Sequence, residues 1–127
     1  LLDAKGTEHA ALIVIDGVPS LDLFYAGGKQ RAVLAAEAIG ATLRLFGASG
    51  RQGMVLVALA DSSALNLFDA AGVRRAELSV STLGSNLALL DTTGKPRVLL
   101  GHDPTADNST LFLYNAAGAG CRAVHCP

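Results

Sequence analysis

A repeat of 22 residues constrains this chain more than any other feature. Glycines recur at steps of 22, 22, 22, 22 and 24 residues, at Gly6, Gly28, Gly50, Gly72, Gly94 and Gly118. A Leu-x-Leu pair precedes most of these glycines at a fixed distance: Leu21/Leu23, Leu43/Leu45, Leu65/Leu67, Leu87/Leu89 and Leu111/Leu113. An aliphatic residue follows each glycine six positions later: Leu12, Leu34, Leu56, Leu78, Leu100 and Val124. A fixed period of this length indicates an array in which each unit buries its apolar face against its neighbours.

The best copy of the unit, residues 65–78, predicts two strands joined by a tight turn. Leu65 and Leu67 alternate with period two, which is strand spacing. Asp69 and Gly72 hold the first and fourth positions of a turn, where aspartate bonds nearby amides and glycine adopts a left-handed conformation. A second strand then runs through the aliphatic position, and a looser connection leads to the next copy.

These features predict an all-β fold of about six 22-residue, two-stranded repeats that form an antiparallel hairpin array, with a β-solenoid as the alternative. The chain is expected to be a single β-repeat domain over residues 1–127, with units at about 1–19 (partial), 20–41, 42–63, 64–85, 86–109 and 110–127. The alanine-rich segment 30–41 favours a helix by itself, but the same positions in other copies favour a strand. Because the first unit starts halfway through the repeat, we expect the chain to be part of a longer product.

A second apolar row accompanies the leucines. The residue after each Leu-x-Leu pair points to the opposite face of its strand, and the row comprises Phe24, Phe46, Phe68, Leu90 and Tyr114. A sheet with one solvated face would place polar residues at these positions. If the leucines fill one core, this aromatic row needs a cover, supplied by the sheet folding over itself, by a solenoid, or by another subunit. We therefore predict that the row forms an interface.

The repeat is similar to that of a family of bacterial proteins with Leu-x-Leu-x-Asp-x-x-Gly-x-x-Arg-x-x-Leu units, and the similarity is best over Leu65 to Leu100. The resemblance implies a β-rich repeat domain outside the cytoplasm, on the cell surface or in the periplasm, and often an upstream anchor. It carries over no catalytic residues. The arginine position holds Arg31, Arg75 and Arg97, but other residues in the remaining units, so a ladder of arginines is expected to be incomplete.

Amino-acid composition limits the classes of partner that this chain can bind. Ten Lys and Arg against 11 Asp and Glu give a formal net charge of −1, and no basic run exceeds Arg74-Arg75. Binding to nucleic acid needs a clustered basic surface, so this class of function is disfavoured. No apolar run approaches the roughly 20 residues of a membrane-spanning helix. We expect no nucleic-acid partner and no membrane-spanning segment in this chain.

None of the candidate chemical sites in the sequence matches a known catalytic or metal-binding pattern, so we do not expect an enzyme. Cys121 and Cys126, with His125, match no common zinc spacing, so a disulfide or free thiols are favoured over a metal site. Segment 103–108 resembles a calcium loop but has Asn108 where such loops need glycine. Segment 47–53 is glycine-rich, yet it aligns with the hairpin turn of the other copies. No Gly-x-Ser-x-Gly motif accompanies the histidines. We predict no catalytic, metal-binding or cofactor-binding residue.

Function is therefore expected to lie in assembly. The leading hypothesis is a structural subunit that packs against copies of itself or within a larger complex. The alternative is an extracytoplasmic module that binds a glycan or a protein through a strand face or through loop 102–109.

Overall fold

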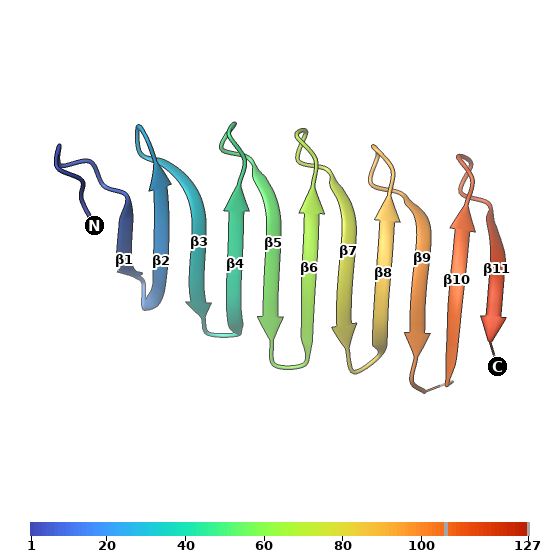
Figure 1. Cartoon of the computed structure of the whole chain (residues 1–127). Coiled ribbons are helices and arrows are strands. Elements are labelled where there is room, and N and C mark those ends of the chain that lie inside the picture. Colours follow the sequence, from blue (N-terminus) through green and yellow to red (C-terminus); the bar gives the residue numbers. More distant parts are fainter. Residues whose placement is uncertain (106, 127) are drawn as a thin grey trace.

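A computed structural model describes residues 1–105 and 107–126, and only the backbone of residues 121–126. The chain forms one sheet of eleven strands that lie in sequence order, side by side (Figure 1). The strands are β1 (Ala10–Ile15), β2 (Val18–Tyr25), β3 (Lys29–Glu37), β4 (Gly40–Phe46), β5 (Gln52–Leu59), β6 (Ser62–Phe68), β7 (Arg74–Ser81), β8 (Gly84–Leu90), β9 (Pro96–Asp103), β10 (Asn108–Tyr114) and β11 (Gly120–Cys126). Each strand pairs antiparallel with the next, which confirms the hairpin array rather than the solenoid.

The repeated glycines form the turns at one edge of the sheet. All six adopt positive φ, between 71° and 84°, as predicted for Gly72. In the fourth unit the Gly72 amide donates to the Asp69 carbonyl at 2.9 Å, and the Asp69 amide donates to the Val73 carbonyl at 2.9 Å. Aspartate and glycine therefore occupy the first and fourth positions of this turn. We call this side of the sheet the glycine-turn edge.

The arginine position of the repeat is a β-bulge. Between β2 and β3, Leu23 pairs with Ala32 and Phe24 pairs with Gln30, so Arg31 has no partner across the ladder. The same shift recurs at Gly53, Arg75 and Arg97. A bulge leaves one residue free to point its side chain elsewhere. This explains why the position can carry arginine in one unit and glycine in another.

Shorter turns connect the strands at the opposite edge. Asp16 and Gly17, with φ of 51° and 81°, form a two-residue hairpin turn, a common use of an Asp-Gly pair. Segment 30–41 holds most of β3, the turn that follows and the start of β4, and it is not helical, as predicted. The looser connection that the repeat predicts is short between β5 and β6, and Ser63 already lies inside β6.

The sheet is a single layer. Among the described side chains only six are buried, namely Asp22, Val33, Ala35, Thr42, Ala88 and Leu90. The accessible surface is 8226 Å², whereas a compact protein of 12.9 kDa exposes about 6,300 Å². The sheet does not fold over itself, and the described part of the chain supplies no second layer to either face.

Candidate functional site

One leucine from each of the strands β1 to β10 lies in a single row across the sheet. Strand register pairs each with the next, in the order Leu12, Leu21, Leu34, Leu43, Leu56, Leu65, Leu78, Leu87, Leu100 and Leu111. A second row runs beside it through Ala10, Leu23, Ala32, Leu45, Met54, Leu67, Ala76, Leu89, Val98 and Leu113. Residues two apart in a strand share a face, so both rows lie on one face. We call it the leucine face.

This face is exposed. Leu34 is 50% exposed and Leu78 is 51% exposed, and Leu21, Leu56 and Leu100 are similar, whereas Leu43, Leu65, Leu87 and Leu111 are half-buried. The expectation that the leucines fill a core is therefore wrong for this chain. The reason is that a side chain standing on a single-layer sheet contacts its neighbours on either side, but nothing packs on top of it.

The opposite face mixes apolar and polar residues. Its central row contains Ala11, Asp22, Val33, Arg44, Val55, Asn66, Glu77, Ala88, Leu99 and Phe112. Polar groups on this mixed face bond to one another: Gln30 Nε2 donates to Asp22 Oδ2 at 2.8 Å, and Arg44 Nη2 lies 3.0 Å from Glu37 Oε1. Asp22 Oδ1 is buried and has no hydrogen-bond partner among the described residues. All six buried residues lie on this face, so the more polar face is the better covered one.

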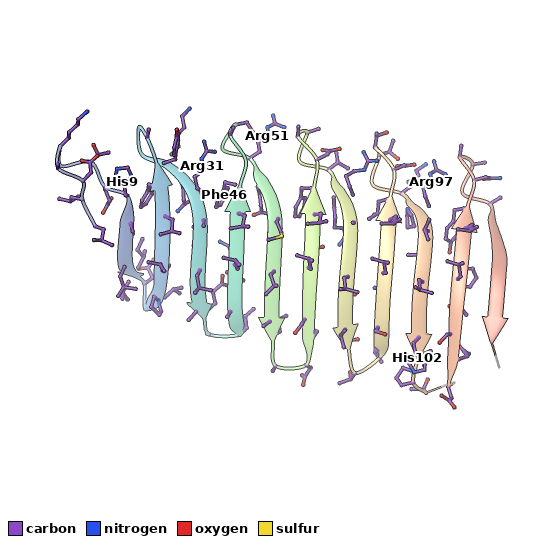
Figure 2. The ribbon with its side chains drawn as sticks, viewed as in Figure 1. His9, Arg31, Phe46, Arg51, Arg97 and His102 are labelled. Carbon is purple, nitrogen blue, oxygen red and sulfur yellow. The ribbon has the colours of Figure 1, made fainter. Side chains whose placement is uncertain are left out.

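The aromatic row lies on the mixed face, opposite the leucines, as the strand period predicts. Leu90 is 8% exposed, and the phenylalanines and Tyr114 are half-buried, with Phe46 labelled in Figure 2. The Tyr114 ring covers the backbone of Gly120, where an added Cβ would lie 3.1 Å from a ring carbon. Side chains of the same sheet thus shield this row in part. Its role as an interface stays a prediction.

Arginines connect successive turns along the glycine-turn edge. Arg31 donates to the Gly47 carbonyl and Arg97 donates to the Asn115 carbonyl, each in the next turn. Arg75 Nε donates to the Leu90 carbonyl at 3.0 Å, at the start of the next turn. Figure 2 shows Arg31, Arg51 and Arg97 along this edge.

The third unit has Gly53 at the arginine position, and its link comes from Arg51, two residues earlier. Arg51 Nη1 donates to the Ala71 carbonyl at 2.9 Å and to the Ala70 carbonyl at 3.3 Å. The ladder of arginines is therefore continuous from the second turn to the last, contrary to the expectation from sequence. The only signal in the sequence was an arginine displaced by two positions.

Turn aspartates reinforce the same edge. Asp69 Oδ1 accepts the amides of Ala71 and Val73 at 2.9 and 3.0 Å, and Asn115 makes the equivalent two bonds in the last turn. The backbone amide of Val73 lowers the pKa of Asp69. The backbone amide of Thr7, with help from His9, lowers the pKa of Asp3 to about 2. The Thr93 hydroxyl, the amides of Lys95 and Thr93, and Arg97 lower the pKa of Asp91.

The other segments that the sequence suggested as sites do not come together in the structure. Gly47–Gly50 closes a hairpin turn through a 3.0 Å bond between the Gly50 amide and the Gly47 carbonyl, rather than forming a phosphate loop. His102 and Asp103, at the start of the predicted binding segment 102–109, line an open depression of about 310 Å³ with mainly polar residues, including Ser85 and Asn86, and residue 106 of this segment lies outside the described residues. In the part of the chain that the structure describes, no three His, Cys, Asp or Glu side chains gather as metal ligands. The side chains of Cys121 and Cys126 lie outside the described residues, so their disulfide stays a prediction.

Comparisons with known proteins do not assign the chain to a family. No protein family profile matches the chain, and no curated protein matches it. A solved structure of a mutant of S. aureus TarM, in complex with Fondaparinux, alpha-GlcNAc-glycerol and UDP, is similar with a TM-score of 0.43 and 8% sequence identity. The alignment covers 91% of this chain and 21% of that one. A likeness at this level carries no argument about function. The structure has no helix, among the residues it describes, that is long and apolar enough to cross a membrane.

Proposed function

We propose that this chain is a structural assembly module whose leucine face packs against the leucine face of a second copy. The observation that carries the proposal is a continuous apolar face, two leucine-rich rows wide and at least ten strands long, that the chain leaves exposed. An apolar stripe of this extent is unusual on a protein that works alone. Burial of apolar surface is the main force that drives protein association.

The size of the exposed surface supports this arrangement. The chain exposes 8226 Å², which exceeds the expectation for a compact protein of its mass by about 1,900 Å². A stable interface of ordinary size needs about 800 Å² from each partner. The excess is shared by both faces of the single layer, and it is large enough for one of them to form an interface of ordinary size.

Sheet geometry points the same way. Open sheets with more than about 10 strands usually curl or pack against a second sheet, and this one has 11. Two sheets that pack face to face lie about 10 Å apart and interdigitate the side chains of their inner faces. Rows of identical leucines are suited to this packing because every strand offers the same side chain at the same height.

Two double variants test the proposal. Leu56→Ser/Leu78→Ser removes side chains from the leucine face, and Phe46→Ser/Phe68→Ser removes them from the mixed face. We expect the leucine variant to shift sedimentation equilibrium from dimer to monomer at micromolar concentration, while circular dichroism still shows a β-sheet. The phenylalanine variant should lower the denaturation midpoint and leave the dimer in place.

Two results would contradict the proposal. A monomeric wild-type protein at these concentrations removes self-assembly. If only the phenylalanine variant loses association, the interface lies at the aromatic row and not on the leucine face.

A further inference from the structure

The two edges of the sheet carry opposite charge. Eight basic side chains lie at the glycine-turn edge: Lys5, Lys29, Arg31, Arg51, Arg74, Arg75, Lys95 and Arg97. Asp3, Glu8, Asp69 and Asp91 lie at the same edge, and Glu77 pairs with Arg74 from within the sheet, so basic side chains stay in excess there. The opposite edge carries Asp16, Glu37, Asp61, Asp103 and Asp107, with no Lys or Arg at its turns and strand ends among the described residues. We call it the acidic edge.

This separation is hidden in the linear sequence. The chain crosses the sheet once per strand, so groups of basic and acidic residues follow one another along it, and the formal net charge of −1 does not reveal their separation. Antiparallel pairing then gathers all the glycine turns at one edge and all the other connections at the opposite edge (Figure 1). In Figure 2, Arg31, Arg51 and Arg97 mark the first edge and His102 marks the second.

We propose that the second copy lies with its basic glycine-turn edge over the acidic edge of the first, related by a two-fold axis that runs along the length of the sheet. The inference rests on the proposed face-to-face dimer and defines its orientation. This axis keeps the leucine faces together and places each strand opposite the same strand of the partner. It also brings opposite charges together along both edges. A two-fold axis parallel to the strands would instead place basic over basic and acidic over acidic.

Other partners fit the charge pattern less well. An anionic membrane surface would attract the glycine-turn edge, but it would repel the acidic edge that borders the same leucine face. A second copy satisfies both edges at once, because the surface that it presents is the same surface turned around. Opposite charges at the rim of an interface guide orientation more than they add affinity.

Charge variants at exposed positions test the orientation. Lys29→Glu/Lys95→Glu makes the glycine-turn edge more acidic, and Asp16→Asn/Asp61→Lys/Thr82→Lys makes the acidic edge more basic. The two sets change the formal charge by the same amount in opposite directions. Neither includes an arginine of the ladder or an aspartate that bonds a turn, and unchanged denaturation midpoints would confirm that both variants fold.

Sedimentation equilibrium under reducing conditions measures the dimer Kd at about 50 mM and about 500 mM salt, since screening lengths differ strongly between the two. The wild-type Kd should rise with salt, because salt screens attraction. Each variant alone should dimerise about tenfold more weakly at low salt, and mixing the two variants should restore dimerisation. A wild-type Kd that falls with salt, edge variants that dimerise like wild type, or a mixture without rescue would overturn the orientation.

The leucine variant separates the two levels of the proposal. If Leu56→Ser/Leu78→Ser gives a monomer and the edge variants do not affect Kd, the face-to-face dimer stands and its proposed orientation is wrong. If the leucine variant does not affect Kd, the assembly proposal itself fails. Binding of a monomeric wild-type protein to vesicles of phosphatidylglycerol and phosphatidylcholine would also overturn both, in favour of a lipid surface.

Discussion

The turns at the two edges of this sheet are stabilised in different ways. At the glycine-turn edge, side chains define the turn: an aspartate or asparagine bonds two amides, a glycine takes positive φ, and arginines reach from one turn to the next. At the acidic edge most turns are shorter, no aspartate or asparagine bonds two turn amides in each unit, and the backbone is crowded at Gly40 and Gly84. An added Cβ at Gly40 would lie 2.0 Å from the Ala58 carbonyl oxygen, and one at Gly84 would lie 2.0 Å from that of His102. Repeated side-chain hydrogen bonds thus define the turns at the glycine-turn edge, whereas close backbone contacts limit the residue type at Gly40 and Gly84.

The largest effect should come from the crowded edge. Gly84→Ala forces a methyl group against the backbone of β9, which must move, and we expect the free energy of unfolding to fall by about 3 kcal/mol. Gly72→Ala provides the matched control at the other edge, because a Cβ there meets no atom within 4 Å. Urea denaturation at one protein concentration compares the two. Equal losses would show that crowding does not distinguish the edges.

Gly72→Val should have the next largest effect. A β-branched residue in the left-handed conformation is strained, and we expect a loss of about 1–2 kcal/mol. Gly72→Asn should lose less, since asparagine tolerates this conformation. Ser63→Val, inside β6, should lose nothing because valine favours strands. A midpoint for Gly72→Val as high as that for Ser63→Val would mean that the glycine is not required by the turn.

Breaking one step of the arginine ladder should have a smaller and more local effect. Arg51→Ala removes the bonds to the carbonyls of Ala70 and Ala71, with a loss of about 0.5–1 kcal/mol. Arg74→Ala is the control, because Arg74 contacts Asn66 and Glu77 within its own hairpin. Hydrogen exchange should speed up at the amides of turn 69–73 only for Arg51→Ala. The same change in both variants would argue against a link between turns.

The pH dependence should be the smallest effect. Asp3, Asp69 and Asp91 have pKa values lowered in the folded protein, to about 2 for Asp3. Between that pKa and the unfolded value of 3.8 the unfolded chain binds more protons, so stability rises with pH in this window. The contribution is fully present above the unfolded pKa and is lost as pH falls through the folded one.

An asparagine variant isolates this effect. Asp3→Asn/Asp69→Asn/Asp91→Asn should retain the turn bonds, as Asn115 does in the last unit, but it cannot titrate. Its denaturation midpoint should therefore change less than that of the wild type between about pH 5 and about pH 2. Parallel curves for the two proteins would show that these carboxylates do not set the acid sensitivity.

The sequence by itself determined the local structure. The 22-residue period identified the strands, the turn glycines at Gly72 and Gly94, and the aromatic row opposite the leucines, because turn chemistry and strand alternation depend on residues close together in the chain. The displaced link of Arg51 was missed because it depends on a turn about twenty residues away.

Only the tertiary structure decided what lies over each face and what gathers at each edge. Equal spacing suits both a solenoid and a meander of hairpins, and an apolar face looks the same in sequence whether or not it is covered. The arrangement follows from pairing between strands, which leaves the leucines exposed on a single layer and separates the charges by edge. These are non-local consequences of topology, and a repeat read along the chain does not contain them.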